Sequence, residues 1–220
     1  TPHHPGSTLM ADIAPHPNRR PALVTGASSG IGAATATALS ASGYPVVLAA
    51  RRVERLEELA EVIRSNGGEV AVVHLDVTDD ESVGAAAVAA REAMGDIEIV
   101  VSNAGDMSPM PAESADTAMF LRQLDTNLVG AHRLVIELLA PMIERRRGDI
   151  VLVTSQNAVT PRPLVGAYNA SKAGLESFGR TLQMELEGTG VRASIVRPGT
   201  TFTEMGWSWA PELIDRCLKD

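Results

Sequence analysis

Cysteine, aromatic side chains and positive charge are all scarce in this chain of 220 residues. The single cysteine, Cys217, excludes a disulfide framework and any cysteine-rich zinc site. Lys and Arg total 19 against 27 Asp and Glu, which gives a formal charge of −8. That balance argues against nucleic-acid and anionic-lipid partners, since both bind through a basic face. The longest apolar runs, such as residues 44–50, are also far too short to cross a bilayer.

Hydrophobic residues, by contrast, make up 45% of the chain and charged residues only 21%, a composition typical of a globular protein. We expect one domain over residues 21–220 in a reducing compartment, the cytoplasm. Residues 1–20 contain several prolines and no hydrophobic periodicity, which predicts a flexible N-terminal tail. Met10 is a candidate natural start that would make residues 1–9 a non-native remnant, and the sequence leaves both origins open.

Six apolar runs of strand length recur along the chain, and segments with helical patterns separate them. Most runs are rich in Val and Ile and continuously apolar, which is typical of parallel strands covered on both faces. The alternation predicts an α/β fold with one doubly wound parallel sheet and right-handed crossovers. The predicted strands are 22–25, 45–50, 70–75, 97–101, 150–153 and 191–196.

Glycines and a capping pattern mark the ends of the predicted helices. Gly43, Gly67 and Gly95 are typical of helix C-termini. Thr78 begins a capping-box pattern that ends at Glu81, at the start of a helix. The helices predicted are 30–42, 52–66 and 79–94, and two longer ones over 113–146 and 166–187.

Ligands of a doubly wound sheet bind beyond the carboxyl ends of its strands, so the residues after each predicted strand form a candidate site. Nearly all of them are polar or glycine, although they directly follow apolar runs. A protein built only for packing has no reason to gather such groups at one edge. They are Thr25-Gly26, Ala50-Arg51, Asp76, Ser102-Asn103, Thr154-Ser155 and Arg197-Pro198-Gly199.

Gly26, Gly30 and Gly32 follow the first predicted strand in the spacing G-x-x-x-G-x-G. Glycine lets a backbone approach a pyrophosphate closely, and the helix that follows supplies free N–H groups and a positive dipole. Three glycines are weak evidence alone, but their place between a strand and a helix strengthens them. We interpret this loop as a nucleotide-phosphate site.

The residue that reads the adenosine ribose is expected near the end of the second strand. Ala50, Arg51 and Arg52 stand there in place of an acidic residue. A guanidinium beside a small neutral residue favours the 2′-phosphate of NADP(H) over NAD(H), through charge-assisted hydrogen bonds. The alternative is that both arginines only solvate the start of a helix.

Tyr168 and Lys172 are four residues apart in a predicted helix and therefore share one face. A tyrosine with a pKa of about 10 is a poor acid–base catalyst at neutral pH. A nearby ammonium stabilises the phenolate and lowers that pKa. Ser155, at a strand end, can hydrogen-bond the carbonyl oxygen that the tyrosine protonates. The alternative for the serine is a helix or turn cap.

Together these residues resemble the short-chain dehydrogenase/reductase family, in an NADP-preferring form, over about residues 20–205. The matching motifs are TGASSGIG at 25–32, Asn103 to Gly105, Tyr168 to Lys172 and Arg197 to Gly199. The resemblance implies a Rossmann fold with strand order 3-2-1-4-5-6. It also implies a catalytic tetrad of Asn127, Ser155, Tyr168 and Lys172, in which the asparagine holds a water of a proton relay.

The resemblance implies a larger set of cofactor contacts. Asp76 and Val77 are expected to flank the adenine, and Lys172 to grip the nicotinamide ribose. The sequence suggests no metal site, because it has no cluster of His, Cys and carboxylate residues. The implied contacts are Gly26, Ser28, Ser29, Gly30, Ile31, Gly32, Arg51, Arg52, Asp76, Val77, Asn103, Ala104, Gly105, Tyr168, Lys172, Pro198, Gly199 and Thr203.

The function implied is an NADP(H)-dependent oxidoreductase that passes hydride between nicotinamide and a carbonyl compound or secondary alcohol. Tyr168 would act as acid and base, and Ser155 would stabilise the oxyanion. The alternative is a catalytically silent nucleotide-binding scaffold or regulator, although the intact tetrad favours the enzyme. A homodimer or homotetramer is expected, with the helices at 113–146 and 166–187 as a dimer surface by resemblance.

Substrate contacts are expected from the loops 106–111, 157–165 and 201–211. Aromatic and apolar residues in the last loop predict a mobile lid, within a lid region 200–220, over an apolar ketone or alcohol. The alternative is that these side chains pack a lid helix against the body. They are Phe202, Met205, Trp207 and Trp209. Family members usually continue into another helix and a seventh, edge strand, which we do not find in this sequence.

Overall fold

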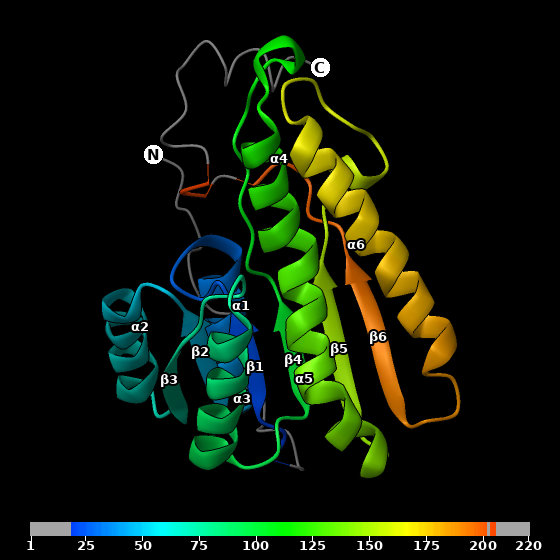
Figure 1. The fold of residues 1–220 in the computed structure, drawn as a ribbon. Helices are drawn as coiled ribbons and strands as arrows, with labels where there is room; N and C mark the ends of the chain where they lie inside the picture. The colour runs from blue at the N-terminus through cyan, green and yellow to red at the C-terminus, as the bar shows by residue number, and fades with distance from the viewer. Residues whose placement is uncertain (1–18, 202, 206–220) are drawn as a thin grey trace, which may run out of the picture.

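Six parallel strands form one sheet in the computed structural model, which describes residues 19–201 and 203–205. They lie in the order β3-β2-β1-β4-β5-β6, as predicted (Figure 1). Their bounds are β1 Ala22–Thr25, β2 Val46–Ala50, β3 Val70–His74, β4 Ile99–Ser102, β5 Gly148–Val153 and β6 Val191–Val196. The inner strand β1 pairs on both sides, so Val24 lies opposite Leu48 of β2 and Val101 of β4.

Helices cover both faces of the sheet. α1 and α2 pack on one face, and α3, α5 and α6 pack on the other, in front of the sheet in Figure 1. Their bounds, with the short α4, are α1 Gly30–Ala41, α2 Val53–Ser65, α3 Asp80–Met94, α4 Thr117–Leu124, α5 Gly130–Glu144 and α6 Gly166–Glu185. In the part of the chain that the structure describes, none of these helices has the length and apolar character needed to cross a membrane.

The strands are buried on both faces, which explains their continuous apolar sequences. Leu23 of β1 packs in a cluster with Leu134 of α5, while its neighbour Val24 packs in a second cluster with Leu56 of α2. All four side chains are almost fully buried. Burying each contributes about 1.5–3 kcal/mol of stability. The core is therefore two apolar layers with the sheet between them, which confirms the predicted doubly wound fold.

The segment 113–146, predicted as one long helix, is divided. It begins with a 3-10 turn at Ala112–Ser114, and a π-helical turn at Asp125–Val129 joins α4 to α5. The side chain of Asp116 begins α4, because it accepts a hydrogen bond from the N–H of Met119 at 2.6 Å. The hydrophobic pattern could not reveal these breaks, since both depend on individual polar side chains.

The cap of α3 lies one residue after its predicted place. Asp79, not Thr78, is the N-cap, and its carboxylate accepts from the N–H groups of Glu81 and Ser82 at 2.9 and 3.3 Å. Thr78 instead donates its N–H and its hydroxyl to Asp76, at 3.0 and 2.7 Å. A carboxylate is the stronger acceptor, so it displaces the hydroxyl from the capping position.

Arg19 and Arg20 are the described part of the predicted tail at 1–20. Arg20 pairs with Asp149 of β5 and donates to Glu98 at 2.9 Å. Arg19 donates to the Met94 carbonyl at 2.6 Å, at the end of α3. These contacts lie at the amino-terminal edge of the sheet, opposite the carboxyl ends where a ligand is expected.

The turn between β1 and α1 leaves no room for a side chain at its three glycines. Gly26 and Gly30 have φ angles of +66° and +55°, which L residues rarely adopt. A Cβ on Gly32 would lie 2.4 Å from the Gly26 carbonyl oxygen and 2.6 Å from Nδ2 of Asn103. Asn103 cannot withdraw easily, because Nδ2 donates to the carbonyl of Thr25 at 2.9 Å. Glycine at these positions lets α1 start close against the sheet.

Substitutions at two glycines test this packing. Gly32→Ala is expected to destabilise the fold by about 1–3 kcal/mol, because the new methyl group overlaps fixed backbone. Gly84→Ala in α3 is the matched control, since a Cβ there would meet no atom within 4 Å. This control is expected to stabilise the fold by about 0.4–1 kcal/mol. Urea unfolding followed by circular dichroism measures both, and equal effects would contradict the packing argument.

Candidate active site

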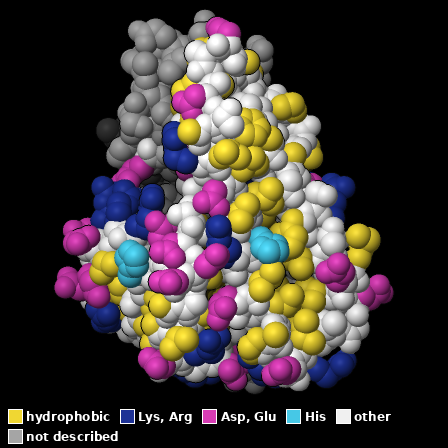
Figure 2. Space-filling model, in the orientation of Figure 1, with side chains coloured by type: hydrophobic (Ala, Val, Ile, Leu, Met, Phe, Trp, Pro, Cys, Tyr) yellow, Lys and Arg dark blue, Asp and Glu magenta, His cyan; other side chains and the backbone are white. Residues whose placement is uncertain are grey.

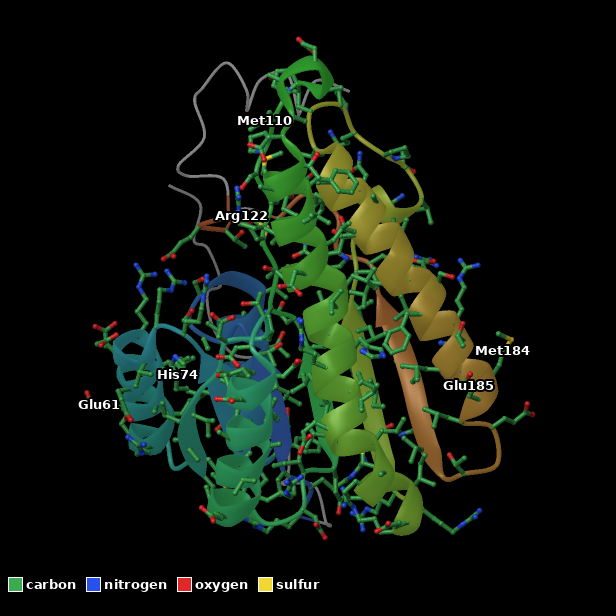
Figure 3. The ribbon with its side chains drawn as sticks, viewed as in Figure 1. Glu61, His74, Met110, Arg122, Met184 and Glu185 are labelled. Atoms are coloured by element: carbon green, nitrogen blue, oxygen red, sulfur yellow. The ribbon has the colours of Figure 1, made fainter. Side chains whose placement is uncertain are left out.

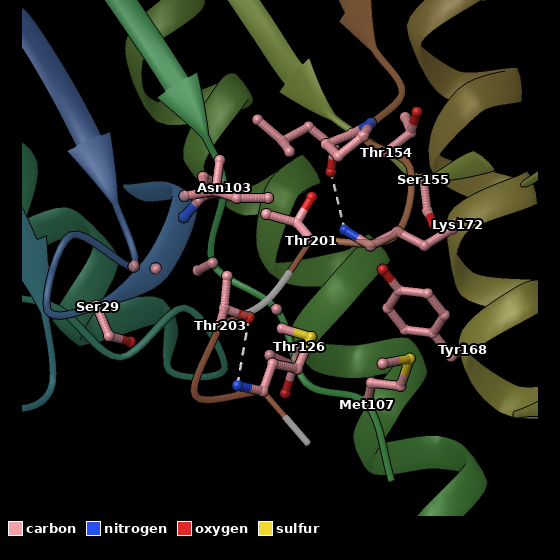
Figure 4. Close-up of a pocket in the computed structure, with 18 of the residues that line it drawn as sticks. Ser29, Asn103, Met107, Thr126, Thr154, Ser155, Tyr168, Lys172, Thr201 and Thr203 are labelled. Carbon is pink, nitrogen blue, oxygen red and sulfur yellow. Dashed lines mark hydrogen bonds between the residues drawn. The ribbon is translucent and has the colours of Figure 1, made fainter. Parts of the chain in front are cut away.

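A cavity of about 520 Å³ lies at the carboxyl ends of the strands (Figure 4). Each of the six predicted strand ends contributes at least one residue to its wall. These residues come from distant parts of the sequence, and the parallel sheet brings them to one edge. They are Gly26, Ala50, Arg51, Asp76, Asn103, Thr154, Ser155, Pro198 and Gly199.

The glycine-rich loop forms one end of the cavity. Residues 28–31 line the wall where α1 begins. Ser29 is the N-cap of α1, but its side chain makes no capping hydrogen bond. The N–H groups of the first helical turn therefore remain available to an anion. Gly32 is not in the wall, because it lies beneath the loop against Gly26.

Two arginines add positive charge beside this loop. Arg51 and Arg52 both line the cavity. The guanidinium of Arg52 donates to Ser28 Oγ at 2.9 Å and to Ser29 Oγ at 2.8 Å, so it lies over the loop. Arg52 therefore does more than solvate the start of α2, and its position is suited to a phosphate.

The segment after β3 forms the adjoining wall. Hydrogen bonds from Thr78, helped by the charge of Arg51, outweigh the effect of burial and lower the pKa of Asp76 below its ordinary value. Its neighbour Val77 is buried against α5, where a Cβ on Gly130 would lie 2.8 Å from the Val77 side chain. An ionised carboxylate and an apolar side chain are thus held side by side.

The middle of the cavity is backbone at the end of β4. The hydroxyl of Thr25 accepts from the N–H groups of Asn103 and Ala104, each at 3.0 Å. Thr25 itself does not line the cavity, so it positions this wall from behind. A Cβ on Gly105 would lie 3.1 Å from Asn127 Oδ1. Glycine at this position therefore leaves room for the Asn127 amide behind the wall.

Three buried polar side chains meet at the other end (Figure 4). Tyr168 and Lys172 come from α6, and Ser155 lies two residues after the end of β5. Ser155 is a polar neighbour of the Tyr168 phenol. Nζ of Lys172 donates to the Val153 carbonyl at 2.8 Å and lies 5.8 Å from the centre of the tyrosine ring. Ser155 also accepts from the Asn157 N–H at 3.1 Å, so the capping role considered from the sequence is present too.

Burial controls the protonation of these groups. It raises the pKa of the Tyr168 phenol, and the polar neighbour Ser155 only partly opposes that rise. It also lowers the pKa of Lys172 to about 8. The expected lowering of the tyrosine pKa by the ammonium is not seen. The ammonium is directed at the Val153 carbonyl, and loss of water around the phenol is the larger effect.

Asn127 lies behind the cavity wall, in the π-helical turn. Its Oδ1 accepts from the Asp106 N–H at 2.7 Å. Its Nδ2 donates to the Asp106 carbonyl at 2.8 Å and to Ser171 Oγ at 3.0 Å. The side chain therefore ties the loop after β4 to α6, and this geometry supports a positioning role.

Residues from the three predicted substrate loops line the cavity, and Met107 among them packs against Tyr168. They include Met107, Asn157, Arg162 and Met205. Asn169 accepts from Asn157 at 3.0 Å and donates to the Arg162 carbonyl at 2.8 Å, which fixes the loop after β5. The charged side chain of Arg162 lines the cavity together with Met107 and Met205, so the lining is less uniformly apolar than expected.

Three predicted residues cannot be compared with the structure, and two residues that were not predicted line the cavity. Phe202, Trp207 and Trp209 of the predicted lid lie outside the described residues. Thr126 and Gln156 line the cavity without having been expected there. Each directly adjoins a predicted residue, which is the only signal that the sequence offered for them.

The two histidines that the structure describes do not line the cavity. His74 is at the end of β3, at the surface (Figure 3), and His132 of α5 packs 5.6 Å from the ring of Phe178. Within residues 19–201 and 203–205, no group of three or more His, Cys, Asp or Glu side chains is arranged to hold a metal.

Similar proteins were found by sequence and by structure. The model of the short chain dehydrogenase family matches residues 20–213. Sulfoacetaldehyde reductase 2 of Chromohalobacter salexigens is 38% identical over 83% of this chain and 73% of that protein. Glycine betaine reductase ATRR of Emericella nidulans is 37% identical over 89% of this chain, which spans only 15% of that protein. A short chain dehydrogenase of Pseudocercospora fijiensis is 33% identical, and the chain spans 60% of its length.

Two similar solved structures are complexes with nucleotides. A variant of actinorhodin polyketide ketoreductase with NADPH has a TM-score of 0.85 and 31% identity, over 89% of this chain and 76% of that one. An alcohol dehydrogenase of Thermococcus sibiricus complexed with 5-hydroxy-NADP has a TM-score of 0.78 and 34% identity, over 83% and 77%. With the fold and the family match, these likenesses show that the chain belongs to the short-chain dehydrogenase/reductase family of oxidoreductases.

Proposed function

We propose that this chain is an NADP(H)-dependent oxidoreductase that transfers hydride between nicotinamide and a carbonyl compound or secondary alcohol. One observation carries the proposal. A single cavity has a buried tyrosine, serine and lysine at one end and two arginines at the other. The NADPH and 5-hydroxy-NADP in the descriptions of two similar structures support the choice of cofactor.

The residues present fit such a cofactor. The uncapped first turn of α1 and residues 28–31 suit a pyrophosphate. Arg51 and Arg52 would bind the 2′-phosphate, and Asp76 and Val77 would flank the adenine. When bound, the nicotinamide supplies or accepts the hydride.

The proton and the charge are handled by the chain's own side chains. In reduction, Tyr168 gives its phenolic proton to the substrate oxygen, and in oxidation it takes that proton back. Ser155 donates a hydrogen bond to the same oxygen as its charge develops. Lys172 would hold the nicotinamide ribose and place a positive charge beside the tyrosine. Asn127 positions the wall around them through Asp106 and Ser171.

A catalytically silent scaffold remains the second candidate. Such a protein would bind NADPH without oxidising it in the presence of any carbonyl compound. The buried group of Tyr168, Ser155 and Lys172 in the cavity wall favours the enzyme, because a nucleotide-binding scaffold has no need for it. A panel of neutral apolar, neutral polar and anionic aldehydes and ketones distinguishes the two, and the anionic members test the influence of Arg162.

We also propose a homodimer through the surface formed by α4, α5 and α6. Hydrophobic side chains gather over α5 and α6 in Figure 2. Leu121 of α4 and Ile136 of α5 are 57% and 58% exposed. Met184, 69% exposed, projects from the end of α6 (Figure 3). A contiguous patch of exposed apolar side chains is typical of an interface.

Removing the tyrosine hydroxyl tests the acid–base role. Tyr168→Phe is expected to lower kcat about 10²- to 10⁴-fold, the usual contribution of a positioned acid or base. Tyr44→Phe removes the other phenol of the chain, at the opposite edge of the sheet, and is expected to leave kcat unchanged. Steady-state oxidation of NADPH measures both variants. A Tyr168→Phe enzyme with full activity would contradict the proposed mechanism.

The pH profile tests the charge on Lys172. Its pKa of about 8 means that the ammonium is lost as pH rises through that value. Tyr168, whose pKa is raised, still holds its proton there. The kcat/KM for carbonyl reduction is therefore expected to be level below about pH 7 and to fall with an apparent pKa of about 8. Reduction that instead accelerates between about pH 7 and 9 would rule this out.

A charge substitution tests the cofactor preference. Arg52→Gln is expected to raise the Kd for NADPH about tenfold or more, because a hydrogen bond to a charged group contributes about 1.5–3 kcal/mol. The Kd for NADH is expected to stay the same. Arg64→Gln is the matched control on α2, since Arg64 pairs with Glu57 at 3.5 Å, at the far end of the helix from Arg52. Fluorescence titration measures all four constants, and equal losses for both cofactors would contradict the assignment.

A further inference from the structure

The chain after β6 crosses the cavity and reaches the glycine-rich loop. We call residues 198–201 and 203–205 the strap. Thr201 and Thr203 face the cavity in Figure 4, and most of the strap lines its wall. The side chain of Thr203 lies 3.1 Å from the place of a Cβ on Gly30. The strap thus connects the substrate end to the phosphate loop.

The next residue of the strap, Glu204, forms ion pairs with two arginines of the α2 region. Both of its carboxylate oxygens accept from Arg55 Nη1 at 2.6 Å, and one accepts from Arg52 Nη1 at 3.2 Å. These two contacts lower the pKa of Glu204, which is therefore ionised at neutral pH. The same Arg52 also donates to Ser28 and Ser29.

We infer that Glu204 is a specificity-determining residue that competes with the 2′-phosphate of NADPH for Arg52 and Arg55. It thereby weakens the preference for NADPH over NADH. The inference rests on the proposed function, because it requires the cofactor to lie in this cavity with its 2′-phosphate beside Arg52. Arg55, which the sequence did not single out, becomes part of the same phosphate-binding group.

Glu204 competes with a phosphate for the two arginines, and it is not needed to hold them in position. Arg52 is already oriented by Ser28 and Ser29, so it does not need the carboxylate to face the loop. The side chains of the two arginines are 46% and 44% exposed, and that of the glutamate is 33% exposed. Ion pairs this exposed contribute little to the stability of the fold. A phosphate and a carboxylate that share these guanidinium groups repel each other, because both are negatively charged.

Neutralising the carboxylate tests the competition. Glu204→Gln is expected to lower the Kd for NADPH about three- to tenfold and to leave that for NADH unchanged. Adenosine 2′,5′-bisphosphate and AMP are expected to show the same contrast, and the gain should shrink at high salt. Glu57→Gln removes an equal charge from α2 and is expected to change neither constant, since Glu57 pairs with Arg64. Fluorescence titration and calorimetry measure these values, and thermal unfolding verifies that each variant is folded.

Failure of the inference and failure of the proposed function give different results. A wild-type chain that binds neither cofactor, or binds NADH more tightly than NADPH, overturns the proposed function. A wild-type chain that prefers NADPH, with an unchanged or weaker Kd in Glu204→Gln, overturns only the inference. An equal fall in Kd for NADPH and NADH in Glu204→Gln also overturns the inference, and so does an equal fall in Kd for NADPH in Glu57→Gln. Either result would be explained by the change in net charge alone.

Discussion

The close approach of α1 to the end of β1 fixes the whole nucleotide end of the cavity. Gly32 lies so near the Gly26 carbonyl and the Asn103 amide that no side chain fits between them. This contact sets where the first turn of α1 points its N–H groups. Arg52 and the strap then take their positions from the same loop, through Ser28, Ser29 and Gly30. A small displacement of one turn would therefore move every group that faces a phosphate.

The opposite end of the cavity depends on burial. Lys172 is held in an apolar setting where its ammonium donates to the Val153 carbonyl, and desolvation lowers its pKa. The same loss of water keeps the proton on Tyr168. A buried cation lowers stability unless it is hydrogen-bonded, and the Val153 carbonyl supplies such a bond. The two ends of the cavity thus differ: solvent-exposed charged side chains lie at the nucleotide end, and buried polar side chains lie at the other.

The sequence predicted what depends on local pattern. The strands were found because parallel strands need apolar side chains on both faces, and the strand-end residues of the cavity followed from that. The break before Asn127 was not predicted, because its partners Asp106 and Ser171 are 21 and 44 residues away. The direction of the Tyr168 pKa shift was also missed, since burial cannot be seen in a spacing. Glu204 meets Arg55 across 149 residues, with no pattern to mark the pair.

The π-helical turn between α4 and α5 has a consequence for how the chain can vary. Such a turn contains one residue more than a regular turn, so α4 is rotated by about 100° relative to an uninterrupted helix. Shortening Asp125–Val129 by one residue would restore a straight rod and swing Met119 from the interior toward water. An amino-acid exchange there leaves this count unchanged, although exchange of Asn127 would remove its hydrogen bonds to Asp106 and Ser171. In this π-helical turn, the number of residues determines the orientation of α4 as much as their identity does.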